Sequence, residues 1–429
     1  MSIILALLIF SLVVTVHELG HFLLAKKSGI GVTEFSIGMG PRVLSTVKGE
    51  TRYSLKLIPF GGSCMMVGED EDNTEQNSFR SKSVSARISV ILAGPIFNFI
   101  LAYILAVVII GMVGYDKPVV TFVEDNSNAM LSGLQEGDII KELNGNKVVL
   151  SRDVDLMLLI NKLQAGENTL VIQRNNQTFP LRFDTEITNE LLLGIRHSGS
   201  SSQPGEILDI IEGGAAEAAG FIAGDVITMI NGTNIDTAEG LSDYISQAVS
   251  LADNTMEITY MRGRKELTAT VTPKITEIKS LGFSYGMREK ANPLEVLRYS
   301  FSEVRFVVES TVQSLRMLIT GQFGVDDLSG PVGIVNMVGD TYDKAKSDGI
   351  YYIIVNMLNL AILISANLGV MNLIPFPAID GGRLIFLIIE AIRRKPIDAN
   401  KEGIVHFAGL ILLMALMIYV MFNDIIKLF

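Results

Sequence analysis

Cysteine is almost absent from this 429-residue chain, which contains only Cys64. A single thiol excludes an intramolecular disulfide and any zinc site built from cysteines, so a metal would have to be bound by histidine, aspartate or glutamate. Charged side chains are also few, at 19% of the residues, whereas 48% are apolar and the mean hydropathy is +0.39. These values indicate a membrane protein. The net charge of -11 concerns solubility and identifies no ligand, and we expect no nucleic acid as a partner.

Four apolar stretches are about 20 residues long, the length that a helix needs to cross the hydrocarbon of a bilayer. The first stretch has neither a basic beginning nor a small-residue cleavage site, so we interpret it as a retained span and not as a signal peptide. The predicted spans are 2–24, 91–114, 352–375 and 403–423.

Lysine and arginine are concentrated in the segment between the first two spans and in the segment between the last two. Because positive residues beside spans favour the cytoplasm, these two segments are predicted to be cytoplasmic. Both termini and the long insert 115–351 then lie on the other side of the membrane.

The insert contains a repeat. The segment from Gly133 to Gly145, GLQEGDIIKELNG, recurs from Gly220 to Gly232 as GFIAGDVITMING. Each copy predicts a glycine turn, a short strand and an Asn-Gly turn into a second strand. The pattern resembles PDZ domains, and it implies two mainly β domains in tandem, at 117–198 and 199–290. Leu193-Gly-Ile195 and Leu281-Gly-Phe283 look like their closing strands. A PDZ groove accepts an extended peptide, so capture of a chain end and simple steric covering of the membrane site are both open.

Residues 291–351 are predicted to form a connector. Its part 293–320 is apolar but carries charges throughout, which favours an amphipathic helix on the outer membrane surface over a fifth span. A helix packed on the second repeat is the alternative. For Ser329-Gly-Pro-Val-Gly-Ile334 we expect close packing only.

The first span contains the sequence His17-Glu18-Leu19-Gly20-His21. On a helix the two histidines lie one turn apart on the same face, so both rings can reach one metal ion, and Glu18 can act as general base. Ionisable groups inside an apolar span cost a few kcal/mol, which favours a function over a structural polar cluster. His17 lies about 13 Å from the cytoplasmic boundary near Lys26, within the membrane.

A third metal ligand is needed, and Asp380 is the candidate. His197 belongs to the external insert and His406 begins another span, which makes both poor choices. Asp380 follows Pro375 and Pro377, where the third span breaks at the same cytoplasmic depth as His21. Just before the break, Asn372 could stabilise an oxyanion or orient the substrate backbone, although an interhelical polar contact is the alternative.

The His-Glu-x-x-His sequence in the first span and Asn-x-x-Pro-x-Pro-x-x-Asp-Gly at 372–381 together resemble the site-2 protease family of intramembrane zinc metalloproteases. With two PDZ-like repeats and four spans, the chain is similar to the bacterial members that regulate sigma factors. The resemblance implies one zinc ion per chain bound by His17, His21 and Asp380, catalysis by Glu18 and substrate contact by Asn372. It implies a multi-pass protein of the bacterial cytoplasmic (inner) membrane with its PDZ-like domains in the periplasm.

The segment Tyr53–Gly62 alternates with strand periodicity before a Gly61-Gly62 turn. In this family such a segment is similar to a re-entrant hairpin beside the active site, whose edge could hold an unwound substrate. A hairpin on the cytoplasmic surface is the alternative.

The expected fold is thus a polytopic α-helical membrane protein, with 1–116 and 352–429 forming the membrane part. The expected activity is hydrolysis of transmembrane segments of single-span proteins. An anti-sigma factor already cut outside the membrane is the expected substrate, with remnant signal peptides as further candidates. A membrane-anchored PDZ scaffold with a vestigial metal site is the alternative, and a metal transporter is disfavoured because only one polar cluster is present.

Overall fold

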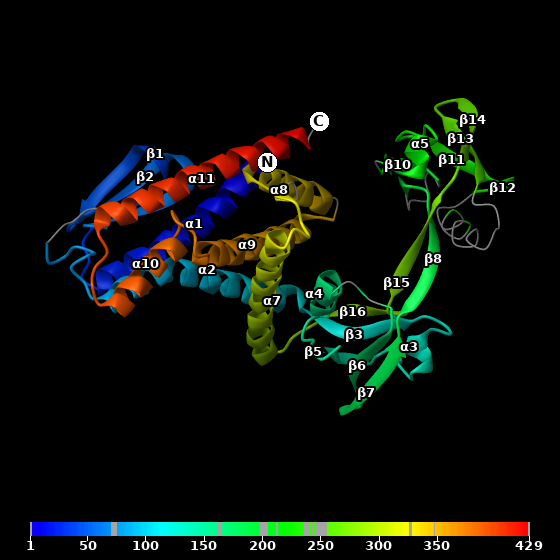
Figure 1. Ribbon diagram of the computed structural model, residues 1–429, viewed down its shortest axis with the longest axis horizontal. Coiled ribbons are helices and arrows are strands. Elements are labelled where there is room, and N and C mark those ends of the chain that lie inside the picture. The colour runs from blue at the N-terminus through cyan, green and yellow to red at the C-terminus, as the bar shows by residue number, and fades with distance from the viewer. Residues whose placement is uncertain are drawn as a thin grey trace. The chain divides into compact units, whose positions relative to one another are not determined.

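The computed structural model describes two units, which we treat separately (Figure 1). The helical unit comprises 1–117, 149–156 and 287–429, and the strand unit comprises 118–148 and 157–286. The residues described are 2–69, 75–161, 163, 165–197, 205–211, 213–235, 241, 244, 255–325, 328–346 and 348–427.

The helical unit contains one β-hairpin and a set of long helices. In chain order its elements are α1 (Ser2–Lys27), β1 (Val32–Lys48), β2 (Thr51–Met66), α2 (Val84–Val113), the beginning of α4 (Ser151–Asn161), α7 (Pro293–Ile319), α8 (Pro331–Lys346), α9 (Ile350–Leu373), α10 (Asp380–Arg393) and α11 (Ala399–Ile426). Among the described residues, four helices are long and apolar enough to cross a membrane, namely α1, α2, α9 and α11. They overlap the four predicted spans, although α2 begins at Val84 and not at 91, so the prediction of four helices of spanning length is confirmed.

Small residues allow α1, α2 and α9 to pack closely. Ala102, Ala106 and Ala366 are fully buried between α2 and α9. A Cβ atom at Gly20 of α1 would lie 2.4 Å from the backbone oxygen of Ala93 in α2. Helices that associate in lipid gain stability from such close backbone approach, since the hydrophobic effect does not distinguish a neighbouring helix from an acyl chain. The three helices form the core that holds the site described below.

The helix α7 forms as predicted, and Asn292 and Glu295 make a capping box at its first turn. Its buried face contacts α2 and α9 through Val307. Arg305 donates hydrogen bonds at 2.9 Å to both carboxylate oxygens of Asp153, at the beginning of α4. The helix therefore packs on the membrane helices of its own unit, while its position relative to the lipid surface stays a prediction.

The glycine-rich segment at the beginning of α8 was expected only to pack closely, but it also forms hydrogen bonds to α11. The backbone N–H groups of Gly330 and Gly333 donate to the carboxylate of Asp424, at 2.9 and 2.8 Å. Asp424 is buried in the last turns of α11, and a Cβ atom at Gly330 would lie 2.8 Å from its Oδ2. The N-terminal amides of a helix lack partners within the helix, so this carboxylate joins α8 to α11.

The strand unit contains the repeat and is built from several antiparallel sheets. One sheet has the order β16-β3-β4-β6-β7, with β5 paired to β4, and a second has the order β12-β11-β13-β14. The strand unit also contains two two-stranded sheets, β10-β9 and β15-β8. The bounds are β3 (Tyr115–Val123), β4 (Ile139–Leu143), β5 (Asn146–Lys147), β6 (Glu167–Arg174), β7 (Gln177–Asp184), β8 (Glu186–Leu192), β9 (Ile195–His197), β10 (Ile207–Ile210), β11 (Val226–Ile230), β12 (Thr233–Asn234), β13 (Met256–Arg262), β14 (Lys265–Val271), β15 (Lys274–Ser280) and β16 (Phe283–Glu289), with short helices α3 (Asn128–Leu131) and α5 (Ala215–Ala218).

The two copies are nested, which corrects the predicted tandem boundary at 198 and 199. Leu193 is buried in the core of the second copy with Ile207 and Phe221, and β9 pairs with β10. The strand β16, after the second copy, joins β3 in the sheet of the first. Each predicted closing strand therefore exists but serves the other copy. The sequence could not show this exchange, because the closing strands of the two copies are alike.

The repeated Gly-Asp dipeptide gives each copy the same ion pair, between a buried aspartate and a partly exposed arginine. In the first copy, Arg174 donates to both carboxylate oxygens of Asp138, at 2.6 and 2.7 Å. In the second, Arg262 donates to both oxygens of Asp225, at 2.8 and 2.7 Å. Each arginine also donates to a backbone oxygen of the preceding turn, Gly133 or Gly220 in the two copies. In each copy the ion pair joins the glycine turn of the motif to the strand that carries the arginine, which is β6 in the first copy and β13 in the second.

We expect Asp225→Asn to destabilise the strand unit by about 2 kcal/mol, because it removes a charge-assisted pair from a buried position. Burial opposes ionisation of Asp225, but Arg262 and the Ile222 N–H outweigh burial and hold its pKa below the ordinary value. The stabilisation is therefore present above about pH 4 and is lost as the pH falls through the lowered pKa of the folded state. Limited proteolysis of the full-length protein across a pH series measures this. Glu266→Gln, an exposed position on the neighbouring strand, is the control, and equal stability of the two variants at pH 7 would contradict the expectation.

Candidate metal centre

Three side chains from distant parts of the chain meet at one point. The Nε2 atoms of His17 and His21 lie 3.1 Å apart, and Asp380 Oδ2 lies 3.2 Å from the first and 3.3 Å from the second. Both imidazoles are buried and Asp380 is half-buried. Their ligand atoms are close enough together to hold one metal ion, and no other group of His, Cys, Asp or Glu side chains among the described residues meets this condition.

The helix α1 presents both histidines because they are four residues apart. The Nδ1 of His21 lies 2.8 Å from the backbone oxygen of Val90. A carbonyl oxygen can only accept, so this Nδ1 carries the proton and the lone pair of Nε2 faces Asp380. The geometry therefore sets the tautomer of His21 that a metal ligand requires.

One face of α2 lines the other side of the three side chains. It presents Val90, Gly94 and Asn98, spaced four residues apart. A Cβ atom at Gly94 would lie 2.4 Å from His21 Nε2 and 2.7 Å from His17 Nε2, so only glycine leaves this space open. Asn98 is fully buried, and its Nδ2 lies 3.2 Å from His17 Nδ1. Sequence reasoning missed Val90 and Gly94, although glycine before Pro95 inside an apolar span was a signal of close approach.

Asp380 is positioned by the break between α9 and α10. The helix α9 ends at Leu373 and α10 begins at Asp380. The intervening loop folds tightly onto α10, since a Cβ atom at Gly381 would lie 2.0 Å from the backbone oxygen of Ile374. Ala378 in this loop has a φ of 80°, which is rare for a residue with a side chain. Pro375 and Pro377 thus end the span as predicted.

The helix α11 holds the same loop from the other side. His406 Nδ1 accepts a hydrogen bond of 2.9 Å from the Ala378 N–H. A Cβ atom at Gly409 would lie 2.4 Å from Pro377 Cβ. His406 is therefore not among the three converging side chains, as the sequence predicted, but it supports the loop that ends at Asp380.

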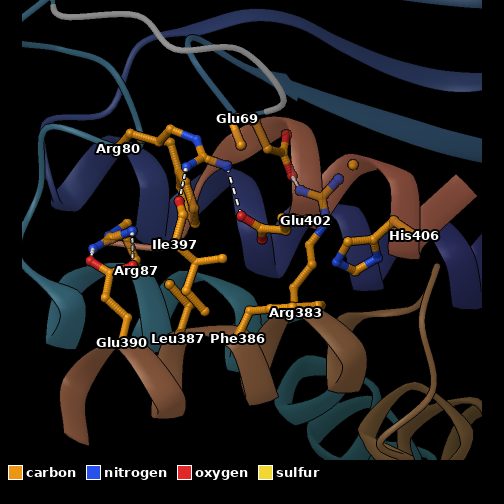
Figure 2. Close-up of a pocket in the computed structure, with 13 residues that line it drawn as sticks. Glu69, Arg80, Arg87, Arg383, Phe386, Leu387, Glu390, Ile397, Glu402 and His406 are labelled. Carbon is orange, nitrogen blue, oxygen red and sulfur yellow. Dashed lines mark hydrogen bonds and ion pairs between the residues drawn. The ribbon is translucent and has the colours of Figure 1, made fainter. Parts of the chain in front are cut away.

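A cluster of ion pairs fixes the far side of α10 (Figure 2). Arg87 of α2 pairs with Glu390, and Glu69 pairs with Arg383 in the first turn of α10. A third pair, of 2.7 Å, joins Arg80, before α2, to Glu402 of α11. All six side chains line one pocket together with His406. Paired charges that are shielded from water resist separation, so α10 is held against α2 and against the segment that follows the hairpin.

The hairpin β1-β2 lies next to Glu18. A Cβ atom at Gly62 would be 3.2 Å from Glu18 Cγ and 3.0 Å from the backbone oxygen of Ser36. Gly61 has a φ of 82° and faces Met39. The segment 62–66 pairs with β1 on one side, and no further strand of the described chain extends this two-stranded sheet. Gly62 is therefore brought to the candidate site beside Glu18, whereas the neighbour of Gly61 is Met39.

Asn372 and His197 lie in different units of the structure. Asn372 is half-buried in the last turn of α9, directly before the break that leads to Asp380. His197 belongs to β9 of the strand unit. Asn98 makes an interhelical polar contact with His17 of α1.

The geometry fits a bound cation. Asp380 Oδ2 is buried and accepts no hydrogen bond from the described residues. Lone pairs of an oxygen and two nitrogens that face one another repel unless a positive charge lies between them. Tetrahedral ligands at the usual zinc distances lie about 3.3 Å apart, close to the separations found here. Two imidazoles and one carboxylate are a typical ligand set for catalytic zinc, which keeps a fourth position open.

Comparison with known proteins matches residues 5–416 to the model of peptidase family M50. The zinc metalloprotease RasP of Geobacillus kaustophilus is 33% identical, over 100% of this chain and 98% of its own length. The regulator of sigma-W protease RasP of Bacillus subtilis is also 33% identical, over 99% of this chain and 98% of its own length. Among solved structures, the HtrA3 PDZ domain bound to a phage-derived ligand matches 21% of this chain and 92% of its own, at 16% identity and a TM-score of 0.19.

The family match covers both the membrane helices and the inserted strand unit, and the two RasP relatives extend over nearly the full chain. The resemblance to site-2 proteases, and within them to bacterial proteases that regulate sigma factors, is thereby confirmed. The chain belongs to peptidase family M50 and is a zinc metalloprotease of the site-2 protease type.

Proposed function

We propose that this protease hydrolyses peptide bonds inside the transmembrane segments of single-span membrane proteins, with one zinc ion per chain. The observation that carries the proposal is the meeting of His17, His21 and Asp380 on apolar helices of spanning length. Charged and polar ligands at membrane depth are costly, and they are retained where they perform a reaction.

Zinc bound by His17, His21 and Asp380 would supply Lewis acidity at this point. Glu18 follows His17 on α1 and would take the proton of the attacking water and pass it to the leaving amine. Asn372 carries an amide that can donate to the oxygen on which negative charge develops. The apolar walls of α1, α2 and α9 keep bulk water out and strengthen these interactions.

The hairpin would present the substrate in an extended form. A peptide bond within a helix is shielded from attack, so the scissile segment has to unwind. The segment 62–66 has a side without a partner strand in the described chain, and it begins beside Glu18. A substrate strand paired there would bring its backbone to the general base. We infer that the hairpin enters the membrane from the cytoplasmic side, and that the protein lies in the bacterial inner membrane.

The strand unit would select substrates. Its two copies carry the PDZ-like motif, and in the proposed topology they lie outside the cytoplasm. Two folded bodies there would exclude a substrate with a large external domain, so cleavage would follow a first external cut. A membrane-bound anti-sigma factor fits this description, and the name of the relative in Bacillus subtilis, a regulator of sigma-W protease, supports that substrate class. Remnant signal peptides are further candidates.

Glu18→Gln should lower cleavage of a model single-span substrate by about 10²- to 10⁴-fold, because the general base is lost. Zinc should remain near one per chain, since the three ligands are intact. Asp380→Asn should lose zinc and activity together. Metal analysis and cleavage assays on purified full-length protein measure both quantities. Glu18→Gln with parental activity, or a parent protein without zinc, would contradict the proposal.

Gly94→Ala should abolish zinc binding, because the added methyl group would lie 2.4 Å from His21 Nε2. Gly111→Ala on the same helix is the matched control, since a methyl group there meets no described atom within 4 Å. Metal content after equilibration with excess zinc separates the two variants. Stoichiometric zinc in Gly94→Ala would show that the ion is bound elsewhere.

Gly62→Val should slow cleavage by about 10-fold or more while leaving zinc in place, because the side chain would displace the hairpin from Glu18. Gly49→Ala is the control. That residue lies at the hairpin turn, with no described atom within 4 Å of an added methyl group. Its φ is 64°, so any backbone strain that alanine introduces is confined to the turn. Equal rates for the two variants would remove the hairpin from the mechanism.

A further inference from the structure

Asn98 has a buried side chain that contacts His17, although Asn98 is not itself one of the three proposed metal ligands. It lies on α2, has no exposed surface, and places its carboxamide 3.2 Å from His17 Nδ1. Its backbone oxygen accepts a 2.8 Å hydrogen bond from Ser365 Oγ, a fully buried group on α9. Asn98 therefore joins α2 to both α1 and α9 at the level of the site.

The Nδ1 atoms of the two histidines have different kinds of hydrogen-bond partner. His21 has a backbone oxygen as the partner of Nδ1, and no substitution removes that acceptor. His17 has only a side chain in the same position. A histidine that gives the lone pair of Nε2 to a cation carries its proton on Nδ1, and that proton needs an acceptor.

The carboxamide of Asn98 can supply that acceptor. Its Nδ2 faces His17 here, which suits a ring with its proton on Nε2. A half-turn about the Cβ–Cγ bond exchanges the amide nitrogen and oxygen in nearly the same volume. Asn98 Oδ1 has no hydrogen-bond partner among the described residues, so the half-turn sacrifices no bond of that atom.

We propose that Asn98 is a positioning residue for the metal, which accepts a hydrogen bond from His17 Nδ1–H and so holds the Nε2 lone pair toward His21 and Asp380. This inference rests on the proposed zinc site and deepens it. Partners of this kind orient a ligating ring, and their loss typically lowers metal affinity by about 10- to 100-fold.

The test measures zinc affinity of full-length protein in detergent, by competition with a chromophoric chelator. Asn98→Leu keeps the size of the side chain and removes the acceptor, so affinity should fall by about 10- to 100-fold. Asn98→Asp keeps an acceptor facing His17 and should restore affinity to within about threefold of the parent. A merely structural role would not be rescued in this way.

Ser365→Ala is the matched control, because it deletes the other buried hydrogen bond of Asn98 without altering the partner of His17. Its zinc affinity should equal that of the parent. If Asn98→Leu does not purify as a folded protein, Asn98→Ala replaces it with the same expectation.

Parental zinc affinity in the variant that lacks the acceptor would overturn the inference, as would an Asn98→Asp protein as weak as Asn98→Leu. Failure of the zinc site itself is a separate result, since the parent would then bind no zinc.

Discussion

The site depends on an electrostatic constraint: three electron-pair donors face one another inside a set of apolar helices. His17, His21 and Asp380 would repel at 3.1–3.3 Å in a medium of low dielectric constant unless a cation lies between them. Much of the helical unit holds these donors together. One face of α2 supplies an acceptor and an open space, the proline loop sets the position of Asp380, and α11 supports that loop through His406.

The supporting interactions increase in polarity toward the predicted cytoplasmic end of the helices. Near the three donors, packing of glycine and alanine dominates, because close backbone contact is the main source of association between helices in lipid. At the far side of α10, three arginine–glutamate pairs take over, and they join α10 and α11 to α2 and its preceding segment. Asp380, the proposed metal ligand, lies between these two regions, at the first residue of α10.

Local patterns in the sequence predicted most of the helical unit and the three converging residues. Four spans follow from length and hydropathy, the histidine spacing follows from the pitch of a helix, and Asp380 follows from a proline break at the right depth. Gly94 escaped prediction because its importance comes from the empty space beside it, which depends on how α1 crosses α2. Asp424 escaped because its partners lie in a distant segment. The ion pairs Asp138–Arg174 and Asp225–Arg262 were not foreseen because their arginines lie outside the repeated motif.

The nesting of the two repeats sets an order of events during synthesis. The sheet of the first copy needs β16, which the ribosome supplies only after the whole second copy has been made. The inner copy can close with β9, which precedes it, and is thus completed first. Until β16 arrives, β3 lacks one neighbour and presents an unpaired edge of the kind that invites wrong partners. The strand β16 is therefore synthesised last in the insert but completes the sheet of the copy that begins first. A chain truncated before β16 would contain a complete second copy and an incomplete first copy.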